Sequence, residues 1–205
     1  MTSRHFYQPR EGHGLAHDPL NAIVAPRPIG WISTVNAAGT ANLAPYSFFN
    51  LFCYKPPIIG FSSQGWKDSV ANADATGEFV WNLATRPQAA AMNTTSIAAA
   101  AGVDEFELAG LDKMPSRLVR PPGVMGSPVQ FECKVTQIIQ LADSVGEDIP
   151  QWMVLGEAIG IHIDSNLIEN GIYQTIKAEP ITRGGGPADY FAITRDQLFQ
   201  MHRPR

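Results

Sequence analysis

The chain has 205 residues, of which 44% are hydrophobic and 17% are charged. This length suits a single domain, and this composition excludes disorder over most of the chain. The formal net charge is −4 and like charges do not form runs, so we expect neither nucleic acid nor a membrane as the main partner.

The start of the chain differs in composition from the rest. Residues 1–21 are polar and rich in His, Gly and Pro, and we expect an N-terminal arm there. The first residues lack the apolar core of a signal peptide, and there is no run of about 18 apolar residues, so we expect a cytoplasmic protein. Cys53 and Cys133 lie far apart in apolar surroundings, which favours buried, reduced thiols over a disulfide or a redox pair.

Short runs of β-branched and aromatic residues fill the first half of the chain. Asn36-Ala37-Ala38-Gly39 has the composition of a turn, so its flanking runs are predicted to form a hairpin. Asp68-Ser69 is typical of a helix start, where either side chain could cap the first N–H groups. The strands predicted in this half are 29–35, 41–53, 58–63 and 78–84, and the helices are 68–75 and 87–101.

The second half carries two longer strand patterns, 128–141 and 152–164, after an irregular segment rich in Pro and Gly that ends near residue 126. Beyond 170 we expect loops and a short terminal helix over 195–201. Many strands with a few short helices favour a mainly β fold closed into a barrel, which leaves no exposed sheet edges. We expect a main domain over 22–193 and a C-terminal tail over 194–205.

The strongest local group of polar residues comprises Ser62, Ser63, Lys67 and Ser69. A strand end, a glycine turn and a helix start gather hydroxyls, backbone N–H groups and one ammonium there. A helix N-terminus also favours a negative charge, so the group suits a phosphate monoester. The alternative is that Ser69 and Asp68 only cap the helix while Lys67 is solvated.

A second feature is the run from Asn42 to Phe48, Asn-Leu-Ala-Pro-Tyr-Ser-Phe. Proline interrupts strand pairing, which frees nearby backbone groups for a flat ring with polar edges. An ordinary bulge at a barrel rim is the alternative. Thr34 in the preceding strand either hydrogen-bonds a ligand or is a plain strand residue.

Arg183 is followed by Gly184, Gly185 and Gly186, which would let backbone and guanidinium approach a phosphate or a ring. A mobile glycine-rich loop is the alternative. The G-x-G-x-x-G fingerprint of dinucleotide-binding domains is missing. The five histidines lack metal-ligand spacing, so we expect no metal, and no residue stands out as a catalytic acid, base or nucleophile.

The order of these motifs resembles the flavin reductase-like, FMN-binding split β-barrel family, in particular its flavoredoxin-like branch. The resemblance covers about residues 20–193. It is carried by Arg27–Thr34, Asn42–Phe49, Pro56-Pro57, Lys67-Asp68-Ser69, Asn72, Glu78–Asn82, Gly156-Glu157-Ala158 with His162, and Arg183-Gly184-Gly185 before Tyr190.

The resemblance implies a homodimer of Greek-key split barrels with FMN near the subunit interface. It implies that the isoalloxazine and ribityl parts contact Thr34, Ala44, Pro45, Tyr46 and Ser47. It also implies that the phosphate contacts Ser62, Ser63, Lys67 and Ser69, and that Arg183 and Gly184 close the site. Because the flavin carries the hydride chemistry in this family, the lack of an acid–base pair agrees with it.

The resemblance therefore predicts an FMN-dependent oxidoreductase that takes electrons from NADH or NADPH and passes them to a flavin or another acceptor. The alternative is an FMN-binding electron carrier without its own nicotinamide-dependent turnover. A related barrel oxidase acting on a pyridoxal-type phosphate ester fits the Asn-Leu-Ala-Pro-Tyr-Ser run less well.

Overall fold

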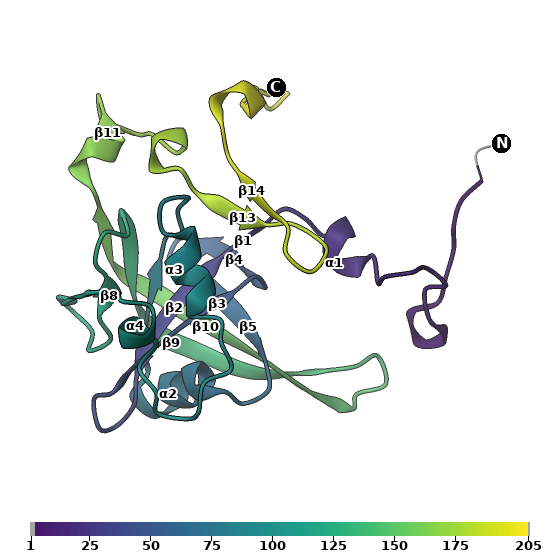
Figure 1. The fold of residues 1–205 in the computed structure, drawn as a ribbon, viewed down its shortest axis with the longest axis horizontal. Coiled ribbons are helices and arrows are strands. Elements are labelled where there is room, and N and C mark those ends of the chain that lie inside the picture. Colours follow the sequence, from purple (N-terminus) through teal and green to yellow (C-terminus); the bar gives the residue numbers. More distant parts are fainter. Residues whose placement is uncertain (1–2, 205) are drawn as a thin grey trace.

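The computed structural model describes residues 3–204 and is mainly β, as predicted. Seven strands form one antiparallel sheet in the order β3-β2-β6-β9-β10-β5-β4 (Figure 1). Their bounds are β2 Gly30–Val35, β3 Ala41–Tyr46, β4 Phe49–Tyr54, β5 Pro57–Gln64, β6 Glu78–Asn82, β9 Val129–Ala142 and β10 Asp148–Ile163.

Smaller elements surround this sheet. The α-helices are α1 Leu20–Ile23, α2 Asp68–Thr76, α3 Ala89–Thr94 and α4 Glu105–Leu108. The short strands form three sheets, β1-β13-β14 (Arg27–Pro28, Ile181–Arg183, Tyr190–Ala192), β7-β8 (Lys113–Met114, Gly123–Val124) and β11-β12 (Ile168–Glu169, Ile172–Tyr173). Single 3₁₀ turns, η1 to η4, lie at Pro9–Glu11, Ser165–Leu167, Ile176–Ala178 and Arg195–Gln197.

The two edge strands of the main sheet, β3 and β4, are consecutive in the chain. Ser47 and Phe48 carry the chain from one edge to the other, and β3 contacts β5, the neighbour of β4. At this corner the ring of Tyr46 in β3 packs against that of Phe61 in β5, with centroids 4.7 Å apart. The sheet therefore closes on itself, and the prediction of one continuous strand over 41–53 is wrong.

The interior of the closed sheet and its outer side hold separate apolar clusters. The interior cluster comprises Ile32, Ile59, Phe61, Val70, Ala73, Phe79, Cys133, Val154 and Ala158. The outer cluster lies between β2, β3 and the segment from α3 to β8, and comprises Ile29, Trp31, Val35, Ala41, Leu43, Ala84, Met92, Phe106, Val124 and Ile181. Strand β2 is consequently buried on both faces.

The predicted helix over 87–101 is too long, because α3 ends at Thr94. The Thr94, Thr95 and Ser96 hydroxyls each donate to a backbone carbonyl oxygen three or four residues earlier, which competes with helix continuation. The predicted terminal helix over 195–201 is likewise only a 3₁₀ turn, η4. The predicted turn at 36–39 is confirmed, with Gly39 at a φ of 87°.

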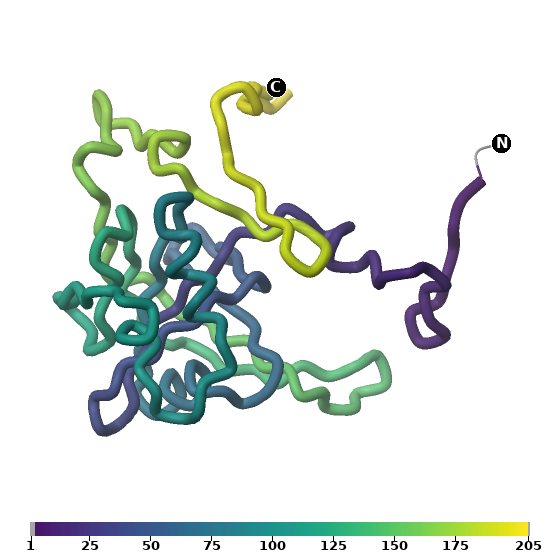
Figure 2. Tube along the Cα trace, viewed as in Figure 1, coloured from purple at the N-terminus to yellow at the C-terminus, as the bar shows by residue number. Residues whose placement is uncertain are grey.

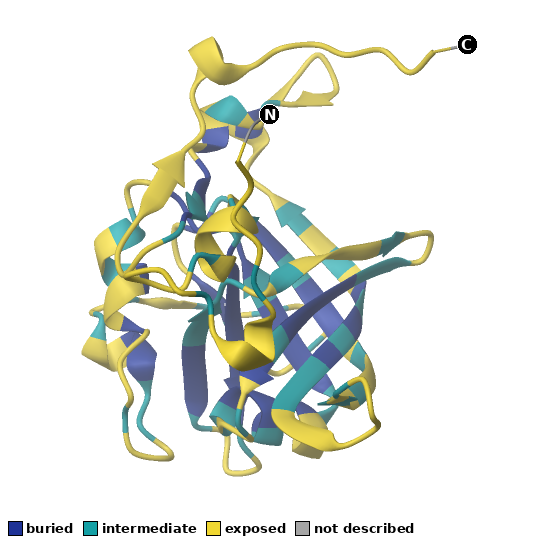
Figure 3. Ribbon diagram, turned by 90° about the vertical axis from the view of Figure 1, so that its right-hand side faces the viewer, coloured by how far each residue is buried: buried dark blue, intermediate teal, exposed yellow. Residues whose placement is uncertain are grey.

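Both ends of the chain leave the barrel, and the N-terminal arm extends far from it (Figure 2). These segments are mostly exposed, whereas the strands of the main sheet carry most of the buried residues (Figure 3). Arg10 of the arm forms an ion pair with Asp143, at the tip of the β9–β10 hairpin, over 2.8 Å. No helix within residues 3–204 is long and apolar enough to cross a membrane.

The loop from Arg117 to Arg120 is held against the sheet by two buried carboxylates. Glu132 accepts the N–H groups of residues 117–119 and lies 2.5 Å from His162 Nε2. Burial opposes ionisation of Glu132, but the Arg117 N–H and His162 outweigh it, so its pKa is lowered. Glu78 bonds to Lys134 and Arg120, which lower its pKa against the effect of burial in the same way.

We predict that these two carboxylates make the fold acid-sensitive. Because their folded-state pKa values lie below the ordinary 4.5, their stabilisation is present above that pH and is lost as the pH falls through the lowered values. Glu132→Gln should cost about 1–3 kcal/mol at pH 7 and flatten the acid limb of the stability profile. Urea unfolding between pH 7 and pH 3 measures both effects. The exposed Glu147→Gln is the control, and equal acid limbs in all three proteins would contradict the prediction.

Candidate flavin site

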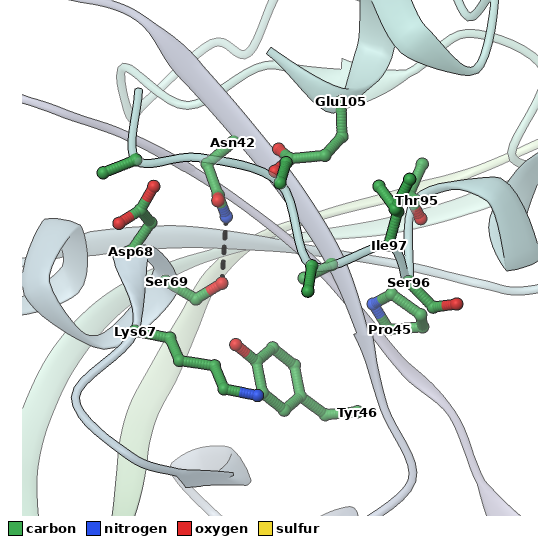
Figure 4. A pocket seen from close by; sticks show the side chains of 14 residues that line it. Asn42, Pro45, Tyr46, Lys67, Asp68, Ser69, Thr95, Ser96, Ile97 and Glu105 are labelled. Carbon is green, nitrogen blue, oxygen red and sulfur yellow. Dashed lines mark hydrogen bonds between the residues drawn. The ribbon is translucent and has the colours of Figure 1, made fainter. Parts of the chain in front are cut away.

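A cavity of about 420 Å³ lies between the edge strand β3, the start of α2 and the segment that joins α3 to α4 (Figure 4). This volume is in the range of small-molecule and cofactor sites. Its wall is formed by Asn42, Ala44, Pro45, Tyr46, Lys67, Asp68, Ser69, Thr95, Ser96, Ile97, Ala98, Ala99, Ala101 and Glu105.

A second cavity, of about 380 Å³, lies on the other side of Tyr46 and Lys67. It shares Pro45, Tyr46 and Lys67 with the first, and its remaining wall comprises Ser47, Phe48, Ser62, Gln64 and Gln151. The fold therefore brings seven of the predicted site residues to two adjoining cavities: Ala44, Pro45, Tyr46, Ser47, Ser62, Lys67 and Ser69.

Lys67 lies where the two cavities adjoin and is the N-cap residue of α2. No hydrogen bond or ion pair involves its ammonium within residues 3–204. The predicted capping by Asp68 or Ser69 is wrong, because no side chain caps this helix. Asp68 instead accepts the Gly102 N–H over 3.2 Å, and Ser69 accepts from Asn42 Nδ2 over 2.9 Å. An uncapped helix start beside an ammonium leaves donors available for an anion.

Strand β3 presents an unpaired backbone edge to the first cavity. It remains paired with β2 as far as the pair of Gly30 with Tyr46, so Pro45 does not break that ladder. Leu43 directs its N–H away from β2, to the Glu105 carboxylate at 2.9 Å. Pro45, two residues later, faces the same way and has no N–H to leave unpaired. The free edge arises from the position of β3 in the sheet rather than from a break at proline.

Tyr46 forms the partition between the two cavities, and its ring packs against Phe61 with centroids 4.7 Å apart. Burial raises the pKa of the Tyr46 hydroxyl, an effect that hydrogen bonding with Ser69 and Ser63 partly offsets. The hydroxyl is therefore protonated at neutral pH and can donate a hydrogen bond.

Two predicted residues lie behind the cavity walls. Thr34 is fully buried, and its hydroxyl oxygen accepts from Asn72 Nδ2 over 3.1 Å. Ser63 is also fully buried, and its hydroxyl donates to the Gly65 carbonyl oxygen over 3.0 Å. Both hydroxyls thus join the barrel to the elements that form the site.

Arg183 and Gly184 line neither cavity. The Arg183 guanidinium donates to the carbonyl oxygens of Gly186, Pro187 and Asp189 and stacks over Tyr190, 4.9 Å from the ring centroid. Gly184 is buried, and its carbonyl oxygen accepts from Arg27. In this structure the arginine organises its own glycine-rich loop.

Sequence reasoning missed the wall formed by Thr95–Ala99, Ala101 and Glu105, and also Gln64 and Gln151. Gln151 donates to the Ser62 hydroxyl over 2.6 Å. Asp104 is a residue type that is typical of helix starts, and its side chain accepts the Phe106 N–H at the start of α4. That signal locates a helix start, but it does not place Glu105 against β3. Within the described residues 3–204, no group of three His, Cys, Asp or Glu side chains could hold a metal ion.

Comparison with known proteins identifies the family. Residues 24–182 match the model of the flavin reductase like domain. An uncharacterized protein of Halalkalibacterium halodurans is 33% identical over 172 residues, which cover 82% of each chain. The chain therefore belongs to the flavin reductase-like family, a family of flavin-related redox proteins.

Two solved structures show the same architecture. Component B of nitrilotriacetate monooxygenase from Bacillus cereus superimposes with a TM-score of 0.89 at 27% identity, covering 98% of this chain and all of that one. A Shewanella frigidimarina protein described as having a split barrel domain gives a TM-score of 0.80 at 20% identity, with 90% of each chain covered. The predicted split-barrel fold is confirmed.

Proposed function

We propose that this protein binds FMN in the two adjoining cavities and is an oxidoreductase of the flavin reductase type. It would take electrons from NADH or NADPH and pass them to a flavin or another acceptor. The observation that carries the proposal is the unpartnered ammonium of Lys67 at the uncapped start of α2, next to the free edge of β3.

The residues around Lys67 suit a phosphate monoester. Ser62 contributes a hydroxyl from the end of β5, and Ser69 contributes one from the first turn of α2. Charge-assisted hydrogen bonds from an ammonium and from N-terminal N–H groups are the contacts that proteins use for phosphates. Ser63 completes the proposed set by fixing the turn at Gly65 that leads to Lys67.

The wall formed by β3 suits a flat ring with polar edges. Ala44, Pro45 and Ser47 offer small side chains beside free backbone, and Tyr46 offers a hydroxyl. Thr34 supports this strand from behind through Asn72 of α2. Closure by Arg183 and Gly184 stays a prediction, and it requires the guanidinium to leave its three carbonyl partners.

Bound FMN would supply the redox chemistry, accepting a hydride from the nicotinamide and yielding two electrons to the acceptor. The residues of the chain then bind the cofactor, orient its ring and balance its charge. Lys67 compensates the phosphate charge, the protonated Tyr46 hydroxyl acts only as a hydrogen-bond donor, and the free edge of β3 orients the ring. No side chain is required to transfer a proton.

We also propose a homodimer, because the edge strand β4 exposes large apolar side chains. Leu51, Phe52 and Tyr54 are 51%, 53% and 78% exposed. Large exposed apolar side chains on an edge strand are typical of an interaction site. A second copy of the chain is the partner that the family resemblance implies. Its packing against β4 would shield these apolar side chains from water.

The phosphate assignment predicts a selective loss in Lys67→Ala. FMN affinity should fall about 10- to 100-fold, since a hydrogen bond to a charged group contributes about 1.5–3 kcal/mol. Riboflavin, which lacks the phosphate, should bind both proteins equally. Fluorescence titration measures both ligands, with Lys55→Ala in the exposed β4–β5 turn as the control. Unchanged FMN affinity, or an equal loss for riboflavin, would refute the assignment.

The oxidoreductase assignment predicts that NADH or NADPH bleaches the flavin absorbance of the FMN-loaded protein under anaerobic conditions. Stoichiometric titration with each donor, followed by addition of excess free flavin, measures reduction and electron delivery. Bleaching by dithionite but by neither nicotinamide would instead identify an electron carrier. Failure to retain FMN at all would overturn the proposal.

The dimer proposal predicts that Phe52→Glu shifts the protein from dimer to monomer in sedimentation or light scattering, because a buried, unpaired charge opposes association. Leu108→Glu, a similarly exposed position on α4 outside this patch, should leave the dimer intact. A wild-type protein that is monomeric at high concentration would contradict the prediction.

A further inference from the structure

A buried carboxylate, Glu105, lies across the first cavity from Lys67 (Figure 4). It is the first residue of α4 and is 6% exposed. Its Oε2 accepts the Leu43 N–H over 2.9 Å. No Lys, Arg or His side chain within residues 3–204 forms an ion pair with it. An ionised group buried without a cation is costly, so packing alone does not explain a glutamate at this position.

The two other buried carboxylates within residues 3–204 have cationic or histidine partners. Glu78 pairs with Lys134 over 2.5 Å, and Glu132 contacts His162 over the same distance. Asp104, next to Glu105 in the chain, pairs with Lys113 over 2.5 Å. Glu105 departs from this pattern, and it is the one of these four that lines the cavity proposed for the cofactor.

The surroundings of Glu105 are acidic as well as buried. Burial raises the pKa of its carboxyl, the Leu43 N–H partly offsets this, and Asp68 and Asp104 raise it further. Asp68 lies in the wall of the same cavity, at the start of α2. The cavity thus has an ammonium and a carboxyl group side by side at the start of α2, and a second carboxyl group, that of Glu105, across from the ammonium.

Glu105 acts on the ring-binding strand in two ways. Its hydrogen bond to Leu43 holds the free edge of β3 immediately before Ala44 and Pro45. Its carboxyl group also lies in the wall of the cavity, so its negative charge when ionised acts on a ring bound there. Reduction of a flavin adds electrons to the ring, and a nearby negative charge opposes this.

We propose that Glu105 positions strand β3 and lowers the reduction potential of the bound cofactor, an inference that rests on the FMN assignment above. A lower potential makes the reduced cofactor a stronger donor to the acceptor. The carboxylate therefore makes reduction of the cofactor by the nicotinamide less favourable and electron transfer from the reduced cofactor to the acceptor more favourable.

The test measures the midpoint potential of FMN-loaded Glu105→Gln by anaerobic equilibration with reference dyes and dithionite. Glutamine keeps an oxygen for the Leu43 N–H but removes the charge. The potential should rise, with the reduction equilibrium favoured about tenfold, which is about 30 mV for a two-electron couple. Glu105→Asp, which keeps the charge, should retain the low potential while thermal unfolding reports the weakened strand contact.

Asp104→Asn is the matched control, because it removes a neighbouring carboxylate that does not line the cavity and leaves an N-cap residue in place. Its potential should equal that of the wild type. If Glu105→Gln does not fold, Glu105→Met tests the same loss of charge at similar volume. FMN bound with an unchanged potential in the neutral variant overturns this inference alone, whereas a wild type that binds no FMN overturns the FMN assignment.

Discussion

The corner at Ser47-Phe48, where the sheet closes, is the constraint on which the rest of the structure depends. Because β3 and β4 are consecutive yet lie at opposite edges of the seven-stranded order, closing the sheet brings the end of β5 beside the end of β3. The packing of Tyr46 in β3 against Phe61 in β5 holds the two strand ends together. The serines of β5, the start of α2 and the proline-containing strand then share one region, and the candidate site follows from this closure.

The candidate site also depends on the burial of β2 on both faces. Its inner side packs in the barrel, while Trp31 on its outer side donates to the Thr95 hydroxyl over 3.0 Å. This contact, with the outer apolar cluster, holds the end of α3 over β3. The segment that follows can then form a cavity wall, although its alanine-rich sequence favours a helix.

The site combines donors and acceptors that the barrel itself does not need. Lys67 has no partner within residues 3–204, Glu105 has no cation, and α2 begins without a side-chain cap. By contrast, Glu78 and Glu132 satisfy their charges within the molecule. Lys67, Glu105 and the start of α2 are the basis on which we propose a ligand with an anionic end at Lys67.

Taken alone, the sequence determined the strand patterns, the turn at 36–39 and the local group Ser62, Ser63, Lys67 and Ser69, because periodicity, turn chemistry and short spacing are local properties. It also carried enough ordered motifs to indicate the family. Only the tertiary structure decided that 41–53 divides into two strands, that Thr34 and Ser63 lie behind the wall, and that Arg183 bonds to its own loop. The placement of Glu105 against Leu43 was decided in the same way, because contacts between residues far apart in the chain depend on sheet closure, which no local pattern encodes.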